Sequence, residues 1–229
     1  MDAKKSENMK TGGHAMRFEF DKKNWTTIAE GEKDCYLLAN GLGGYSSLSV
    51  IGAAARGDQA LLMSAKRAPN VRMHLVTNLF EKLVVDGREH ILTSQRMRSG
   101  ADHEGFHYLE RFVYDDFDAE APSWTFRADD VTVTKHLLMV HDENTVAVKY
   151  EIDAPAGRNA ALELLPLLRF TSKKEDFDAA QDLDAYRIEP CSAGEKTDQT
   201  GSSYCVTGND NTLYLTTNAE LHTQKPSLF

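Results

Sequence analysis

The feature that most restricts the fold of this chain is an alternation of apolar and polar residues with a period of two. Val146, Val148, Tyr150 and Ile152, for example, recur at every second position. Side chains of a β-strand point to opposite faces in turn, so this period indicates strands with one buried face. The same reasoning predicts strands in 71–75, 82–85, 89–92, 106–114, 124–126, 131–139, 161–170, 186–188, 204–206 and 213–215.

Turn residues separate these segments at short intervals. Asp86-Gly87 lies between two apolar segments and predicts a tight hairpin. Asp129-Asp130 predicts a second turn, and residues 154–157 (APAG) end another strand. Pro166 interrupts the segment 161–170, and because proline cannot donate a backbone hydrogen bond we expect an edge strand or a bulge there.

No segment has the pattern of a convincing amphipathic helix. Residues 53–63 have helical propensity, but Gly52 and Gly57 weaken a helix at that point. Sheets with one apolar face must cover that face, and strands joined by short turns do so by packing sheet on sheet. We therefore predict an all-β fold, an antiparallel β-sandwich resembling a supersandwich, formed by residues 16–229 as a single domain.

Composition excludes several classes of partner. The formal net charge is −9 and the pI is near 5.4, whereas nucleic-acid and anionic membrane surfaces call for clustered Lys and Arg. No apolar run approaches the roughly 20 residues that a membrane helix needs. We predict a soluble protein without nucleic-acid or membrane partners, which leaves neutral partners such as sugars.

The N-terminal residues and the cysteines bear on location. Residues 1–15 are polar and unpatterned, which predicts a flexible arm and not a secretory signal. The cysteines are three in number, Cys35, Cys191 and Cys205, with no C-x-x-C or Cys/His spacing typical of zinc. We expect reduced thiols, no metal, no cofactor and a cytoplasmic location.

One stretch, residues 36–63, has a composition that folding alone does not explain. Its centre is the run 40–45, N-G-L-G-G-Y, where three glycines follow an asparagine within five positions. Glycine permits positive φ, so Gly41, Gly43 and Gly44 predict a tight, shaped turn. A phosphate-binding loop is the alternative, but the spacing of a dinucleotide fingerprint is absent and no Lys-Ser/Thr follows.

This stretch also carries a resemblance. The run 36–47, YLLANGLGGYSS, together with Ile51-Gly52, Arg56 and Leu61-Leu62, resembles the sequence that opens prokaryotic-type glycogen debranching enzymes, the amylo-α-1,6-glucosidases. Further segments resemble the N-terminal domain of that family in the same order. These segments are 70–72, 81, 86–87, 111–115, 135–139, 143–146 and 165–170.

The resemblance extends over about 24–170, with two departures. Tyr36 stands where tryptophan is usual, and Asp58-Gln59-Ala60 stands where the family has Tyr-His-Gly. Asp and Gln side chains can still hydrogen-bond sugar hydroxyls. The resemblance implies a β-sandwich N-terminal domain, followed in the family by a helical barrel that holds the catalytic carboxylates.

The same stretch supplies the candidate binding residues. Sugar sites combine aromatic faces with planar hydrogen-bonding groups, and this stretch provides both beside the Asn-Gly turn. We predict that five residues lie together and contact substrate: Asn40, Tyr45, Arg56, Asp58 and Gln59. In the alternative, Arg56 and Asp58 lie on a solvated strand while Tyr45 enters the core.

Catalytic residues are not evident. Glycoside hydrolysis usually needs two opposed carboxylates, but Asp115, Asp116, Asp118 and Glu120 form an acidic loop typical of a solvated surface. We therefore predict no catalytic residue in this chain and no glucose release by the isolated chain.

Two hypotheses for function follow. In the first, the chain is the noncatalytic N-terminal domain of a glycogen debranching enzyme, with the C-terminal catalytic domain of the same polypeptide and branched α-glucan (glycogen or limit dextrin) as partners. In the second, it is a stand-alone carbohydrate-binding or protein-interaction sandwich. A reading frame that continues for several hundred residues with helical periodicity would favour the first.

Overall fold

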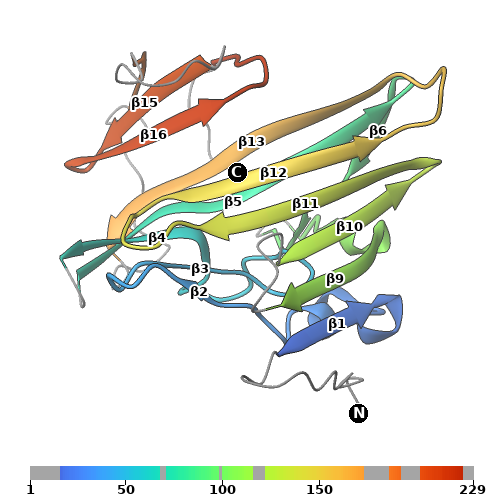
Figure 1. Ribbon diagram of the computed structural model, residues 1–229, viewed down its shortest axis with the longest axis horizontal. Helices are drawn as coiled ribbons and strands as arrows, with labels where there is room; N and C mark the ends of the chain where they lie inside the picture. The colour runs from blue at the N-terminus through green and yellow to red at the C-terminus, as the bar shows by residue number, and fades with distance from the viewer. Residues whose placement is uncertain are drawn as a thin grey trace, which may run out of the picture.

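The structure is a computed structural model that describes residues 16–67, 71–97, 100–115, 122–172, 186–191 and 202–223. The predicted arm, residues 1–15, lies outside the described residues, as does most of the acidic loop at 116–121. Within the described part most residues lie in antiparallel strands (Figure 1). The predicted all-β class is therefore confirmed.

The first sheet has five antiparallel strands in the order β1-β9-β10-β11-β12. They are β1 (Arg17–Asp21), β9 (Leu109–Asp115), β10 (Ser123–Ala128), β11 (Val131–Met139) and β12 (Val146–Asp153). The predicted turn at Asp129-Asp130 joins β10 to β11, where Ala128 pairs with Val131. Asp129 has a φ of 54°, a left-handed conformation that Asp tolerates better than most residues.

The second sheet has six strands, in the order β13-β5-β4-β3-β2 with β6 paired to β5. They are β2 (Leu38–Ala39), β3 (Tyr45–Ser47), β4 (Ala60–Arg67), β5 (Val71–Val85), β6 (Arg88–Ile91) and β13 (Ala160–Ser172). Asp86 and Gly87 form the β5–β6 hairpin with φ values of 50° and 83°, which confirms the predicted turn. Pro166 lies in β13, the edge strand of this sheet, and the register shifts just after Leu167.

Two smaller sheets and three short helices complete the described fold. The third sheet is β14 (Arg187–Pro190), β15 (Ser202–Gly208) and β16 (Asn211–Thr217), and a two-stranded sheet pairs β7 (Ser94–Gln95) with β8 (His103–Glu104). The helices are η1 (Lys22–Asn24), α1 (Ile28–Gly31) and η2 (Gly105–His107). The segment 53–63 is not helical, since turns precede strand β4. Among the described residues no helix has the length and apolar character needed to cross a membrane.

The main hydrophobic core lies between the first and second sheets. Leu83 and Val85 of β5 are fully buried, and so are Val133 and Leu137 of β11, all within one cluster. The alternating pattern explains this arrangement, because every second residue of each strand points toward the opposite sheet. The predicted sandwich is confirmed.

The third sheet is attached to the second through the end of β13. Val206 and Leu213 are buried in the main core cluster, and the Asn209 side-chain amide donates to the carbonyl of Phe170 at 2.9 Å. The Tyr186 ring packs edge-on against Phe170, with centroids 5.4 Å apart. In Figure 1, β15 and β16 lie at the upper left, whereas β1 lies near the bottom. Tyr186 itself precedes the strand, so β14 begins one residue later than the predicted segment 186–188.

One strand prediction was wrong in its extent. Residues 106–114 were expected to form one strand, but Gly105–His107 is a 3-10 turn and β9 begins at Leu109. The Gly105 backbone packs directly on Leu92 and Thr93, and its N–H donates to the Thr93 carbonyl at 3.1 Å. This nonlocal contact bends the chain where the local pattern favours an extended conformation.

A buried ion pair connects the two sheets. The Lys135 Nζ atom of β11 lies 2.6 Å from a Glu81 carboxylate oxygen of β5, and the Tyr150 hydroxyl of β12 donates to the same oxygen. The Lys135 ammonium also lies 5.3 Å from the centroid of the Trp124 ring. Burial raises the pKa of Tyr150 well above its ordinary value, and the nearby Glu81 charge raises it further. A charged pair can be buried here because its partners replace water.

Candidate functional site

The Asn-Gly-rich segment forms the tight turn between β2 and β3. The Asn40 N–H donates to the Gly44 carbonyl at 3.1 Å, and the Asn40 side-chain oxygen accepts from the Leu42 N–H at 3.0 Å. Gly41 and Gly43 have φ values of 82° and 97°, which a Cβ atom would strain. The predicted tight turn is thereby confirmed at these two glycines.

Gly44 needs to be glycine for a different reason. It is not among the residues with positive φ, so the expected left-handed conformation was wrong at this position. A Cβ atom on Gly44 would lie 2.8 Å from Asn144 Oδ1 and 3.0 Å from the Met63 carbonyl oxygen. Close packing of three chain segments, and not the backbone conformation, excludes a side chain here.

The turn is held by residues far away in the sequence. The Asn40 amide nitrogen donates to the Glu143 carbonyl at 2.8 Å and to the Asn144 side-chain oxygen at 3.0 Å. Arg72 donates from Nε to the Gly43 carbonyl at 2.6 Å, and its guanidinium lies 5.4 Å from the Tyr45 ring centroid. Three separate parts of the family resemblance, the run 40–45, Arg72 and residues 143–144, therefore meet in space.

A second group of predicted residues forms the turn before β4. The buried Gln59 side-chain oxygen accepts from the Ala55 N–H at 2.8 Å and from the Arg56 N–H at 3.2 Å. The Tyr45 hydroxyl donates to the Asp58 carbonyl at 2.7 Å. These contacts bring Tyr45, Arg56, Asp58 and Gln59 together, whereas the Asn40 side chain faces the 143–144 segment.

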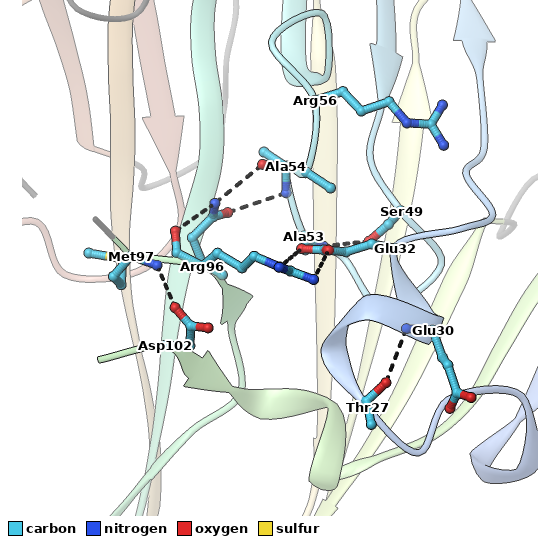
Figure 2. A network of polar contacts seen from close by, with 12 residues as sticks. Thr27, Glu30, Glu32, Ser49, Ala53, Ala54, Arg56, Arg96, Met97 and Asp102 are labelled. Atoms are coloured by element: carbon cyan, nitrogen blue, oxygen red, sulfur yellow. Dashed lines mark hydrogen bonds and ion pairs between the residues drawn. The ribbon is translucent and has the colours of Figure 1, made fainter. Parts of the chain in front are cut away.

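Two further side chains fix the backbone just before this turn. The Ala53 N–H donates to Ser49 Oγ at 3.0 Å. The Gln95 side-chain amide forms two bonds with Ala54, accepting from its N–H and donating to its carbonyl, both at 3.2 Å (Figure 2). Every backbone N–H from 53 to 56 is thus hydrogen-bonded to a side chain. The three alanines at 53–55 add little bulk, so the segment is fixed by polar contacts.

Arg56 projects from this fixed backbone toward solvent. Its guanidinium donates to the Lys33 carbonyl at 3.2 Å and contacts the Cys35 sulfur at 3.9 Å. Figure 2 shows its side chain extending away from Ala54 and from Arg96. A guanidinium has five N–H donors, and these two contacts leave donors for a ligand. The backbone that carries Arg56 is itself held by the hydrogen bonds of Gln59.

The neighbouring loop is braced by a bidentate ion pair. Arg96 donates from Nε to one Glu32 carboxylate oxygen at 3.1 Å, and its terminal nitrogen lies 2.8 Å from the other (Figure 2). Beside it, the Met97 N–H donates to the Asp102 carboxylate at 2.8 Å. The parallel geometry of the Arg96 pair fixes orientation as well as distance. The loops around Arg56 are therefore rigidly supported.

The five predicted residues fall into two classes of exposure. Asn40 and Gln59 are 0% and 3% exposed, and Tyr45 is 9% exposed with its hydroxyl bonded to backbone. Arg56 and Asp58 are exposed. A substrate contact by all five stays a prediction, and the geometry assigns supporting positions to the three buried residues. Sequence reasoning did not identify Ser49 or Gln95, because nothing local marks a side chain that bonds a distant backbone.

The described residues do not form a metal-binding cluster. No group of three or more His, Cys, Asp or Glu side chains there is placed to hold a metal ion. His107 and Glu104 form a local pair on the surface, with 3.4 Å between the imidazole Nε2 atom and a carboxylate oxygen. The site defined by this geometry is one of hydrogen bonding, centred on an exposed arginine.

The fold and the Asn-Gly turn define a class, an all-β sandwich whose exposed loops are fixed by side-chain to backbone bonds. Comparison with protein families identifies the particular one: the family model described as "Glycogen debranching enzyme N terminal" matches residues 35–229. The chain belongs to this family, that of the N-terminal domain of glycogen debranching enzymes. Neither the curated proteins nor the solved structures gave a match.

Proposed function

We propose that this chain is the noncatalytic N-terminal domain of an amylo-α-1,6-glucosidase, that it packs on the catalytic domain of the same polypeptide, and that it helps to seat branched α-glucan. Membership of the debranching-enzyme family supports the reaction and the substrate class. The observation that carries the seating role is the exposed Arg56 on a backbone held by Ser49, Gln95 and Gln59.

Arg56 suits a sugar ligand because of its donors. A neutral glucan offers many hydroxyl oxygens as acceptors, and a planar guanidinium can donate to two of them at once. Asp58, exposed two residues later, supplies acceptors for the hydroxyl protons. Together they form a small polar surface that complements a hydroxyl-rich ligand without needing an opposite charge.

The test is a kinetic measurement on a polypeptide that carries this chain ahead of a catalytic domain. Arg56→Ala should lower kcat/KM for a branched limit dextrin by about tenfold, which corresponds to one lost charge-assisted contact. Arg127→Ala is the matched control, since Arg127 is an exposed arginine on β10 of the first sheet. The melting temperatures of both variants should equal that of the unmodified protein.

The outcomes separate the parts of this proposal. Unchanged kinetics for Arg56→Ala would remove the seating role, and an equal loss in Arg127→Ala would show a nonspecific effect of surface charge. The isolated chain should release no glucose from limit dextrin, and release above a blank would contradict the noncatalytic assignment.

A further inference from the structure

The third sheet has a second face that points away from the core. Along β16, Leu213 is 7% exposed and lies in the main core cluster, whereas the next residue, Tyr214, is 69% exposed. Among the large hydrophobic side chains of the described residues, none is more exposed than Tyr214. Since successive residues of a strand point to opposite faces, Tyr214 lies on the outer face of this sheet.

Strand register shows which residues share that face. Tyr214 pairs with Cys205, and Cys205 pairs with Glu189 on β14. Thr212 and Thr216 lie two residues before and after Tyr214 on the same strand, and both are exposed. The Tyr214 ring is therefore flanked by a hydroxyl group on each side along β16.

Strands β15 and β14 add further polar groups to this face. Ser203 pairs with Thr216, and their hydroxyl oxygens lie 3.1 Å apart. Arg187 and Glu189 lie two residues apart on β14, on the same face, and both are exposed. The face thus combines one aromatic ring, several hydroxyls, one planar donor and one planar acceptor.

The charge of this face indicates what kind of ligand it fits. Arg187 and Glu189 cancel, so the face is neutral although the chain as a whole carries −9. A neutral face of hydroxyls around an exposed ring complements a neutral ligand that presents both C–H and O–H groups.

We propose that the outer face of the third sheet is a second α-glucan site, distinct from the Arg56 surface. A glucosyl ring lies with its C–H face on the Tyr214 ring, while Thr212, Thr216 and Glu189 bond the hydroxyls along its edge. The choice of α-glucan over other neutral sugars rests on the proposed function. Each site alone is small, but two sites on one chain can contact two branches of the same glycogen particle, which makes the second contact intramolecular.

The test is affinity electrophoresis of the full 229-residue chain in native gels that contain glycogen. The unmodified chain should be retarded, and Tyr214→Ala should raise the apparent Kd about tenfold, as expected for loss of a central aromatic contact. Tyr214→Phe keeps the ring and should stay within about twofold of the unmodified chain. Leu138→Ala is the matched control, because Leu138 is an exposed apolar residue at 51% on β11 of the first sheet.

Each outcome decides the proposal. Equal retardation of the unmodified chain and Tyr214→Ala overturns it, and so does an equal loss in Leu138→Ala. Absence of any retardation also overturns it. A change in oligomeric mass for Tyr214→Ala, measured by light scattering without a change in retardation, would show that the face instead binds a second copy of the chain.

These outcomes are independent of the Arg56 proposal. Hydrolysis of limit dextrin by the joined polypeptide reports on Arg56, whereas glycogen binding by this chain with Tyr214 changed reports on the third sheet. If Tyr214→Ala binds normally while Arg56→Ala hydrolyses poorly, only the second site is rejected. The melting temperature of Tyr214→Ala should be unchanged, because a side chain that is 69% exposed contributes little to packing.

Discussion

Two adjacent residues of strand β5 carry ion pairs in opposite environments. Glu81 points into the sandwich and pairs with Lys135 at 2.6 Å, and the two side chains are 5% and 3% exposed. Lys82 points outward and lies 2.8 Å from both Glu89 and Glu163, whose side chains are 62% and 60% exposed. The distances are alike, so burial is the main difference between the two ion pairs.

The difference teaches that an ion-pair distance is a poor guide to stability. In water the exposed charges are solvated whether or not they pair, so the outer pairs have little net effect. Inside the sandwich the Glu81 charge has lost its water, and removal of one partner leaves the other charge without solvation. The contacts of Glu81 with Lys135 on β11 and with Tyr150 on β12 therefore take the place of that water.

The largest expected effect comes from breaking the inner pair. Glu81→Gln keeps the side-chain size but leaves the Lys135 ammonium buried without a counter-charge, and should lower the free energy of unfolding by about 3 to 5 kcal/mol. Urea denaturation at pH 7 measures this loss. A triple variant, Glu81→Leu with Lys135→Met and Tyr150→Phe, removes all three polar groups and should recover most of it. A loss below about 1 kcal/mol in Glu81→Gln would contradict the comparison.

A third ionisable residue of β5 sharpens the comparison, since it is buried without an opposite charge. His74 is 2% exposed, its Nε2 atom contacts the Thr77 hydroxyl at 3.0 Å, and its Nδ1 atom has no hydrogen-bond partner among the described residues. Burial lowers the pKa of His74 to about 3, and the nearby Arg169 charge lowers it further. The imidazole is therefore neutral in the folded protein at any pH above about 4.

The corresponding pH dependence has a definite sign. Between the folded pKa of about 3 and an unfolded value near 6.5, the unfolded chain binds the extra proton. The free energy of unfolding should therefore fall as the pH is lowered through this window, by about 2 kcal/mol at pH 5 relative to pH 7. Urea titrations of the unmodified chain and His74→Gln should diverge in slope only below about pH 6.5. Parallel curves would rule out His74 as the cause.

The smallest effect is expected for the outer pair. The Lys82 side chain is 22% exposed, but its partners Glu89 and Glu163 are 62% and 60% exposed. Hydrogen bonds to Glu163 and then Glu89 raise the pKa of Lys82, so it stays charged at neutral pH. Lys82→Met should change the melting temperature by about 2 °C or less in 0.15 M salt, because exposed pairs are screened. A calorimetric shift as large as that of Glu81→Gln would show that the outward face of β5 is covered in solution.

The sequence by itself predicted the elements whose causes are local. The β5–β6 hairpin follows from Asp86 and Gly87, whose residue types tolerate positive φ. The buried face of β11 and the partly buried face of β12 follow from the period of two. It also indicated the family, because the signature around Asn40 is a contiguous run. These features depend on a few neighbouring residues, so no tertiary contact is needed to infer them.

Only the tertiary structure decided which polar side chains are buried and what they bind. Asn40 and Gln59 have the residue types of ligand contacts, yet both are buried and bond backbone, while Gln95 carries no local signal and fixes Ala54. Similarly, Glu81 and Lys82 are both charged residues of one strand, and only the position of the first sheet determines which one loses its water. Desolvation depends on the segments that cover a residue, and those segments lie tens of residues away in the sequence.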